Sequence, residues 1–353
     1  MDIQQILSGA VKSKAADIFL VAGLPLSYKI NGQIRHQNEE KLTPAQTNEL
    51  ILAIYGLSKG HSPNHLLEHG DDDFSFSLPG LSRFRVSTYK QRGSLAAVIR
   101  VVNFELPDYK DLGIPDNVMR IAGMTKGFVL VTGPAGSGKS TTLACIIDAI
   151  NTTRDVHIIT LEDPIEYLHR HKKSVVSQRE VSTDTDSYEV ALRAALRQAP
   201  DVILLGEMRD YETIKTAITA AETGHLDIST LHTIGAGKTI DRVIDAFPPN
   251  QQQQIRVQLS MTLQAVVSQQ LVPTVDGQVV PACEVMFLNN AIRTMIRESK
   301  VHQMDTVIQT SSGEGMITMD SSLLGLCQQG KITAETALHF STNPELMQKR
   351  LRM

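Results

Sequence analysis

Gly133-Pro134-Ala135-Gly136-Ser137-Gly138-Lys139-Ser140 matches the phosphate-binding pattern G-x-x-x-x-G-K-[ST]. An apolar run at 128–132 precedes it and indicates a buried strand, and the amphipathic stretch 141–150 indicates a helix. In this setting backbone N–H groups and a helix N-terminus face a phosphate. We expect Lys139 to reach the β- and γ-phosphates, Ser140 to ligate Mg²⁺, and Thr141 to complete the nucleotide site. A chance glycine turn is the alternative, and the match at every fixed position argues against it.

Length and composition limit the class of protein. The chain has 353 residues, which suggests about two domains, and its 42% hydrophobic and 20% charged content is ordinary for a globular protein. The three cysteines, Cys145, Cys283 and Cys327, lack C-x-x-C spacing and are expected to be reduced, packed cytosolic thiols. We expect neither a signal peptide nor a membrane span. A net charge of −4 and the absence of Trp argue against a nucleic-acid partner.

The pattern of the chain changes near residue 103. Residues 1–102 contain strand-like stretches and few helices, so we expect a small α+β domain, followed by a Pro- and Gly-containing linker at 103–115. From Met124 strands and helices alternate, which is typical of a parallel α/β sheet, so 116–353 form the second domain. Beyond Ala236 the pattern predicts mostly helices, including a helical region at 290–353. In the second domain as a whole, the predicted strands are 128–132, 156–161, 202–205, 226–231 and 279–288. The predicted helices between the first four strands are 139–150, 187–199 and 211–223.

Two acidic clusters follow predicted strands. Glu162, Asp163 and Glu166 come after the strand 156–161, and Glu207 comes directly after the strand 202–205. Ligand sites of open α/β sheets lie at the carboxyl ends of the strands. Each cluster alone is equally well explained as an acidic start of a helix, which the helix dipole favours. Their joint occurrence favours a functional role, because phosphoryl transfer needs carboxylates for Mg²⁺ and water.

Two histidines, His225 and His232, flank the predicted strand 226–231. Their odd separation places them on opposite faces of a regular strand, which argues against a shared metal. One is expected to be a structural histidine, and a phosphate-sensing role is open to the other.

The sequence contains four motifs: the phosphate loop, the acidic cluster Glu162–Glu166, the cluster Gly206–Asp210 and the histidine stretch His225–His232. They stand in the order found in secretion ATPases. Over nearly its whole length the chain resembles the type IV pilus retraction ATPases, including the stretch 73–100 and the late helix 291–298. Extension and type II secretion relatives carry a longer N-terminal region and a four-cysteine zinc insert; we expect neither here, which favours the retraction branch. Asp227 departs from the family, which usually has an apolar residue there, and Ile18-Phe19-Leu20 replaces a stretch that often contains His.

The resemblance implies a homohexamer of two-domain subunits, a PAS-like domain followed by a RecA-like domain, with ATP between them. It implies that Glu166 is the catalytic carboxylate, that Glu207 holds Mg²⁺ through water, and that His225 and His232 sense the nucleotide. It also implies that N-terminal arginines reach the phosphates. The candidates are Arg83, Arg85, Arg92 and Arg100. The implied partners are the inner-membrane platform protein of the pilus machine and, indirectly, pilin, at the cytoplasmic face of that membrane.

Two other functions compete with a motor that acts on a protein fibre. RecA-like rings also move DNA, but the acidic balance of this chain and its lack of a basic and aromatic stretch argue against a nucleic-acid translocase. A nucleotide-gated scaffold would bind ATP without turnover. The resemblance favours the motor.

Overall fold

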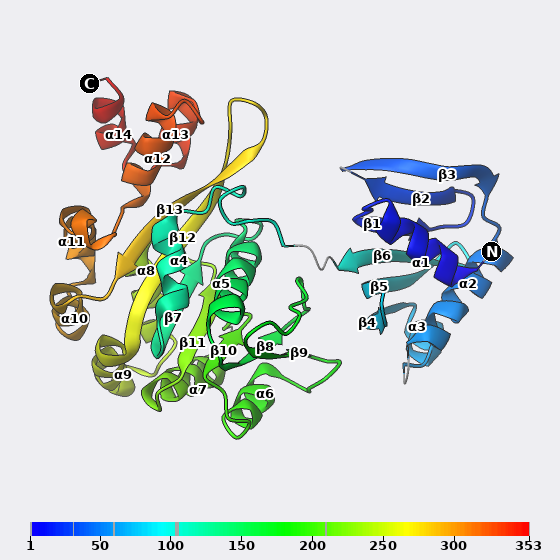
Figure 1. Cartoon of the computed structure of the whole chain (residues 1–353), viewed down its shortest axis with the longest axis horizontal. Coiled ribbons are helices and arrows are strands. Elements are labelled where there is room, and N and C mark those ends of the chain that lie inside the picture. Colours follow the sequence, from blue (N-terminus) through cyan, green and yellow to red (C-terminus); the bar gives the residue numbers. More distant parts are fainter. Residues whose placement is uncertain (1, 31, 59–60, 103–105, 209, 353) are drawn as a thin grey trace. The chain divides into compact units, whose positions relative to one another are not determined.

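The structure is a computed structural model that describes residues 2–30, 32–58, 61–102, 106–208 and 210–352 (Figure 1). The chain divides into two compact units, Met1–Glu105 with Glu166–Leu168, and Leu106–Ile165 with His169–Met353. The predicted bounds of the domains and the linker stay predictions. Three parts of the sequence predictions lie outside the described residues: Asn31 of a predicted hairpin turn, 103–105 of the predicted linker, and Arg209 after Glu207.

The first unit is built on a six-stranded antiparallel sheet with the order β3-β2-β1-β6-β5-β4. Phe84 and Val86 of β5 are fully buried, whereas Arg85 between them is exposed, as the period of two along a strand requires. One face therefore carries the core and the other carries charged side chains. The strands are β1 (Asp17–Leu20), β2 (Pro25–Ile30), β3 (Gln33–Lys41), β4 (Asp71–Leu78), β5 (Ser82–Gln91) and β6 (Ser94–Val102).

Three helices belong to this unit: α1 (Ile3–Lys12), α2 (Pro44–Leu57) and α3 (Asn64–His69). In the sequence, Thr43 with Pro44 after it and Gln46 three residues on predicts a capping box at the start of α2. This prediction is confirmed, because Thr43 Oγ1 accepts from the N–H of Gln46 and Gln46 Oε1 accepts from the N–H of Thr43. Leu7 of α1 and Ile54 of α2 are fully buried in the same core as Phe84. The unit thus has its own hydrophobic core.

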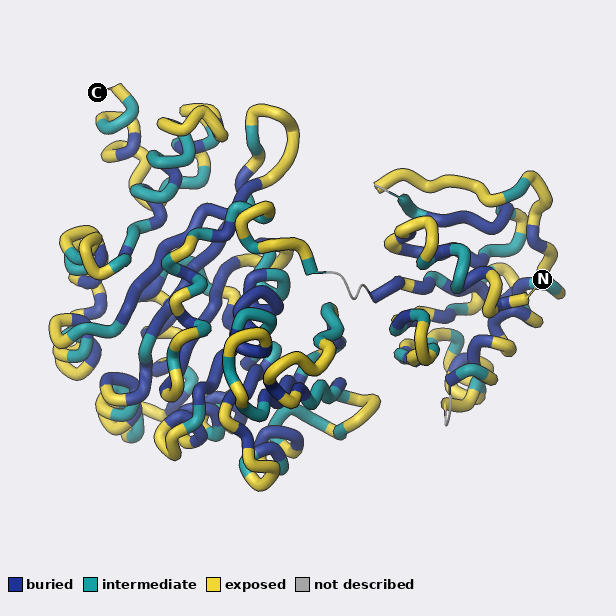
Figure 2. The backbone as a smooth tube through the Cα atoms, viewed as in Figure 1, coloured by how far each residue is buried: buried dark blue, intermediate teal, exposed yellow. Residues whose placement is uncertain are grey.

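The second unit is built on a seven-stranded sheet with the order β13-β12-β7-β11-β10-β8-β9. All neighbours are parallel except the edge pair β12 and β13. The central strands are buried along their length, as Figure 2 shows, because helices cover both faces of a parallel sheet. The strands are β7 (Gly127–Thr132), β8 (His157–Glu162), β9 (Val175–Glu180), β10 (Val202–Leu205), β11 (Leu226–Leu231), β12 (Leu263–Pro273) and β13 (Val279–Phe287).

Helices connect these strands and complete the C-terminal end. The α-helices are α4 (Asp116–Met119), α5 (Lys139–Thr153), α6 (Tyr188–Ala195), α7 (Tyr211–Glu222), α8 (Ala236–Asp245), α9 (Pro249–Thr262), α10 (Asn290–Arg297), α11 (Met304–Thr310), α12 (Met319–Gln328), α13 (Ala334–Phe340) and α14 (Pro344–Leu351). Short 3₁₀ turns occupy Arg120–Gly123, Val301–Gln303 and Ser312–Glu314. The last three α-helices have a small core of their own around Leu323, Ala337 and Met347.

The structure corrects two predictions about this unit. The prediction of mostly helical structure beyond Ala236 was wrong for β12, because a strand buried on both faces lacks the period of two and its apolar run resembles a buried helix. The helix predicted at 187–199 ends at Ala195, and Ala199, with φ 49°, precedes Pro200, which disfavours helical geometry. The elements α4 and β9 of this unit, and α3 of the first unit, were not predicted from the sequence.

Candidate functional site

The phosphate-binding loop joins β7 to α5, and its backbone requires glycine. Gly133, Gly136 and Gly138 have φ angles of 145°, 74° and 83°, which side chains with a Cβ rarely allow. A Cβ at Gly133 would also collide with the carbonyl oxygen of Gln269 on β12. Since α5 begins at Lys139, directly after the loop, its unpaired N–H groups open toward the loop.

Polar groups inside the loop fit a phosphate. Lys139 Nζ donates to the carbonyl oxygens of Gly133 and Pro134, both at 2.9 Å, so the ammonium group lies over the loop. The hydroxyl of Ser137 is buried and has no hydrogen-bond partner among the described residues. Such a group costs about 1–3 kcal/mol, and a phosphate oxygen would satisfy it. Ser140 and Thr141 stand half-buried in the first turn of α5, where the sequence predicted the nucleotide site.

Gln269 supports the loop from β12, although no sequence motif had pointed to it. Its Nε2 donates to the carbonyl oxygen of Ser137 at 2.7 Å, and its Oε1 accepts from Thr142 Oγ1 on α5 at 2.8 Å. The residue is only 2% exposed, so both contacts lie out of water. A glutamine within an apolar strand is the signal that could have revealed it, but this stretch was predicted to be helical.

Four neighbouring strands bring the predicted motifs to one edge of the sheet. In the order β7, β11, β10 and β8, the register pairs Thr132 with Leu231, and Leu205 with Leu161. The residues after the paired positions therefore lie side by side: Gly133 of the loop, His232, Gly206 before Glu207, and Glu162 at the end of β8. This is the carboxyl edge of the sheet, the usual place of ligands in α/β folds.

Glu207 and His232 meet at this edge. His232 Nε2 lies 3.4 Å from Glu207 Oε2, and both side chains line a cavity of about 490 Å³. Glu207 is 17% exposed at its side chain, so a metal ion in water can reach its carboxylate. Arg242 of α8 lines the same cavity, and the sequence motifs gave no sign of it.

The remaining acidic candidates lie in different surroundings. Glu162 Oε1 accepts from Thr160 Oγ1 at 2.6 Å and from Gln178 Nε2 at 3.3 Å, so this carboxylate is bound to its own and the neighbouring strand. Asp163 is exposed and lines a separate cavity of about 520 Å³ together with Asp210. Glu166 is exposed in the segment that follows β8. The catalytic roles of these three residues stay predictions.

The predicted arginines form one group and one outlier within the first unit. Arg85 and Arg100 are directly opposite on β5 and β6 and line a cavity of about 340 Å³. Arg100 Nε donates to Asp17 Oδ1 at 3.0 Å. Arg83 lies two residues along β5 on the same face, where Nη1 contacts Ser77 Oγ at 3.3 Å. Arg92 stands apart in the turn at the far end of β5. The structure therefore brings three of the four arginines together.

His225 lies at the opposite end of β11 from His232. Its Nδ1 contacts Thr223 Oγ1 at 3.0 Å and the carbonyl oxygen of Ala220 at 3.1 Å. Six residues of strand, about 20 Å, separate it from the phosphate loop of its own subunit. The structure does not bring His225 to the site in this subunit, and its predicted sensing role stays a prediction.

Asp227, the departure from the family pattern, is buried rather than facing solvent. It is 3% exposed, and neither carboxylate oxygen has a hydrogen-bond partner among the described residues. Burial raises the pKa of this carboxyl well above its usual range. Glu284 of β13 is equally buried, but it accepts from the N–H groups of Ala236 and Met319.

The predicted packing of the cysteines is confirmed. Cys145 and Cys283 are buried, Cys327 is half-buried, and all three are free thiols. Burial raises the pKa of Cys145 to about 11, so its thiol is protonated and unreactive near neutral pH. No helix among the described residues combines the length and the apolar character that crossing a bilayer demands.

A comparison with protein families finds a match that covers nearly the whole chain. A family model described as "Type II/IV secretion system protein" matches residues 1–321, which include both sheets, the phosphate loop and the carboxyl edge. The chain belongs to this family. The match extends through the 3₁₀ turn Ser312–Glu314 and the start of α12 and ends before α13 and α14.

Two relatives within the family are similar over most of the chain. The type IV pilus retraction ATPase PilT of Pseudomonas aeruginosa is 45% identical over 345 residues, which are 98% of this chain and 99% of that protein. A twitching motility protein of Neisseria gonorrhoeae is 44% identical over 320 residues, 90% of this chain and 85% of the relative.

Solved structures agree with the sequence comparison. The crystal structure of the pilus retraction motor PilT with bound ADP has a TM-score of 0.90 and 46% identity, covering 99% of each chain. The ATPase DotB of Legionella pneumophila has a TM-score of 0.76 and 28% identity, covering 95% of this chain and 94% of DotB. The resemblance to the type IV pilus retraction ATPases is thereby confirmed, and so is the α/β class with a small α+β unit before the ATPase unit.

Proposed function

We propose that the chain is the ATP-hydrolysing motor that powers type IV pilus retraction, and thus twitching motility. The observation that carries the proposal is the likeness to the ADP-bound retraction motor, which covers 99% of both chains at 46% identity. The phosphate loop and the carboxyl edge supply the groups that such an activity needs. The motor works as a homohexamer, as the family resemblance implies.

The site residues divide the chemistry among them. Lys139 and the loop N–H groups hold the β- and γ-phosphates, while Ser140 and, through water, Glu207 hold Mg²⁺. When bound, this ion neutralises charge on the phosphate oxygens. Glu166 accepts a proton from the water that attacks the γ-phosphorus as the bond to the bridging oxygen of ADP breaks.

Two further groups complete the proposed cycle. Arg85 and Arg100, with Arg83 beside them, stabilise the charge that develops on the transferred phosphoryl group. His232 contacts Glu207 at 3.4 Å and lies four residues before the first residue of α8, so a change at the Mg²⁺ ligand can move the start of that helix. Glu162 and Asp163 are assigned a supporting electrostatic role at the end of β8.

The partners follow from the proposed task. The motor acts in the cytoplasm at the inner face of the cytoplasmic membrane, where the platform protein of the pilus machine transmits its motion to pilin. The late helix α10 supports this view, since Ile292 and Ile296 are fully buried while Arg297 is exposed. An apolar face thus anchors the helix and a cationic face remains for coupling.

The proposal is tested by pairing biochemistry with complementation. The purified chain should hydrolyse ATP in the presence of Mg²⁺ and have the mass of six subunits by light scattering. In a strain with the gene deleted, the wild-type gene should restore twitching, and the Lys139→Ala variant should not.

The turnover rate of Lys139→Ala should be lower than that of the wild type by about two to three decades. One preorganised donor stabilises the charge of a transition state by about 3–4 kcal/mol, and its loss has an effect of this size. Turnover by this variant near the wild-type rate would remove the phosphate-loop assignment. Binding of ATP without hydrolysis by the wild type would favour the scaffold, and binding of DNA that weakens steeply with salt would favour the translocase.

A further inference from the structure

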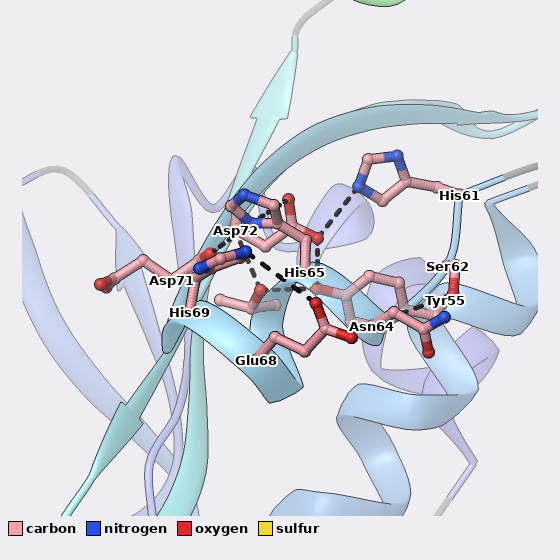
Figure 3. Close-up of polar contacts among 10 residues, drawn as sticks. Tyr55, His61, Ser62, Asn64, His65, Glu68, His69, Asp71 and Asp72 are labelled. Atoms are coloured by element: carbon pink, nitrogen blue, oxygen red, sulfur yellow. Dashed lines mark hydrogen bonds and ion pairs between the residues drawn. The ribbon is translucent and has the colours of Figure 1, made fainter.

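The short helix α3 of the first unit carries two histidines that the proposed motor function does not use. Its sequence His65-Leu66-Leu67-Glu68-His69 has the spacing H-x-x-E-H, which places two imidazoles and a carboxylate on one side of a helix in zinc proteins. Figure 3 shows both rings beside each other at the end of the helix, next to Asp71. The spacing and the position of the rings together suggest a metal chelate.

The two rings are close enough to share one ion. Their centroids lie 4.6 Å apart with an angle of 45° between the ring planes. Metal–nitrogen bonds of about 2.0–2.1 Å put the centres of two imidazoles on one ion about 5 Å apart. A small rotation of His69, whose ring has no hydrogen bond among the described residues, is therefore sufficient, and solvent reaches both rings, with 62% of His65 and 64% of His69 exposed.

Each of the two imidazole rings also has a nitrogen atom that can bind a metal ion. His65 Nδ1 lies 2.9 Å from the carbonyl oxygen of Asp71, so Nδ1–H donates and Nε2 keeps its lone pair for a metal. Metal-binding histidines commonly donate their other ring N–H to a backbone carbonyl in this way. His69 Nε2 lies 4.0 Å from Glu68 Oε2, beyond hydrogen-bond distance, so this nitrogen is available as well.

The surrounding carboxylates favour a cation but do not complete a closed site. Asp72 is already engaged, because Tyr55 OH donates to its Oδ2 at 2.8 Å and His61 Nε2 lies 3.0 Å from the same atom. Across the described ranges of the chain, no three His, Cys, Asp or Glu side chains are placed to hold a metal ion. Water must therefore fill the other positions, which excludes a structural zinc site and indicates an exchangeable ion.

We propose that His65 and His69 form a two-histidine chelate for a divalent transition metal ion of the zinc, nickel and copper class. Neutral imidazole nitrogens suit these ions, whereas Mg²⁺ and Ca²⁺ require oxygen ligands. None of the residues of α3 has a role in the proposed nucleotide chemistry, so substitutions of its histidines leave the proposed catalytic groups in place.

Calorimetric titration of the untagged full-length protein with NiCl₂, without nucleotide, tests the proposal. Nickel is the probe because the free cysteines of the chain compete less for it than for zinc. We expect one nickel ion per subunit, displaced by zinc and unaffected by millimolar Mg²⁺. His65→Ala and His69→Ala should each weaken nickel binding at least about tenfold, since losing a ligand costs no less than losing the partner that orients one.

His339→Ala is the matched control, because it removes an exposed histidine from α13, and it should bind nickel as the wild type does. The His69→Ala variant has the further advantage that no hydrogen bond of the fold depends on this side chain among the described residues, so circular dichroism and ATP turnover should stay unchanged. Absence of nickel binding by the wild type, or equal binding by the wild type and the double variant His65→Ala with His69→Ala, would overturn the chelate.

Discussion

The two edges of the parallel sheet in the ATPase unit differ in what their polar groups contact. At the carboxyl edge, Ser137 has a hydroxyl without a partner among the described residues, and Glu207 shares a cavity with His232. At the amino edge, two polar groups are bound within the chain: His225 contacts Ala220 and Thr223, and the N–H of Leu288 donates to the carbonyl oxygen of Gln264. The exception near this edge is Asp227, which is buried without a partner among the described residues. One edge is arranged for a ligand and the other for packing.

The amino edge nevertheless carries the proposed coupling helix. β13 is antiparallel to β12, so its end lies beside the start of β12, and α10 follows there. Arg293 Nη1 donates to the carbonyl oxygen of Ser260 at 2.6 Å, which ties α10 to the C-terminal end of α9. If α10 is the coupling helix, turnover and coupling use opposite edges of one sheet, and substitutions at the two edges should have separable effects.

The largest effect is expected from Glu166→Gln in the segment after β8. The amide keeps the shape of the side chain but cannot accept a proton from water, so turnover should fall by about two to four decades. Binding of ATP, measured by calorimetry, should remain. Glu335→Gln, which removes an exposed carboxylate from α13, is the matched control and should keep the wild-type turnover. Normal turnover by Glu166→Gln together with an inactive Glu207→Gln would mean that the two roles are exchanged.

Gln269→Leu should have the next largest effect. It tests whether β12 stabilises the conformation of the phosphate loop at the carboxyl edge. The leucine leaves Ser137 O and Thr142 Oγ1 without their partner, which costs about 1–3 kcal/mol. If this cost falls on the bound loop, KM for ATP rises about 5- to 150-fold. A lower Tm with an unchanged KM would reduce Gln269 to a packing residue.

Gln270→Leu is the control for this experiment. The neighbouring glutamine points the other way, toward the carbonyl oxygen of Phe340 at 3.4 Å, and should leave KM unchanged. Gln269→Glu sharpens the result, since it can still accept from Thr142 but no longer donates to Ser137. Its KM should lie at or above that of Gln269→Leu.

The sequence was sufficient to predict those parts of the site whose geometry is local. The glycine positions of the phosphate loop, Lys139 and the helix after it are dictated within one stretch, and the carboxyl ends of predicted parallel strands must meet at one edge. The sequence alone therefore placed the motifs around Glu207 and His232 together. The capping box at Thr43 was predicted for the same reason, since all its contacts lie within four residues.

Long-range contacts could not be predicted in this way. Gln269 is more than a hundred residues from Ser137 in sequence, and its strand was hidden because burial on both faces removes the periodicity that distinguishes strand from helix. Arg242 reaches the Glu207 cavity from a helix whose sequence shows only an amphipathic pattern. The burial of Asp227 was equally invisible, because a carboxylate in a strand is normally taken as solvent-facing.

Arg297→Ala at the amino edge should change turnover by less than about twofold, because surface substitutions away from buried features have small effects. It should nevertheless abolish twitching while surface pili remain, if α10 couples ATP turnover to the pilus machine. Arg297 is the cleaner test than Arg293, whose bond to Ser260 gives it a structural role. Arg35→Ala, an exposed arginine on β3, controls for loss of surface charge. Normal twitching by Arg297→Ala would end the coupling role and leave the amino edge purely structural.

The smallest effect on turnover, none, is expected from Asp227→Asn in the second residue of β11. Its effect is on stability and on the pH dependence of stability. Burial raises the folded-state pKa of Asp227 above its unfolded value of about 3.9, so the native state binds the extra proton. The wild type should therefore lose stability as pH rises from about 4 through the folded-state pKa, by about 1.4 kcal/mol per pH unit at the steepest. The asparagine cannot titrate, so its Tm relative to the wild type should rise with pH over this window.

Asp155→Asn, which removes an exposed carboxylate, should follow the wild-type slope. Parallel slopes for Asp227→Asn and the wild type would mean that this carboxyl finds a partner in solution, and that the amino half of β11 holds a polar contact after all.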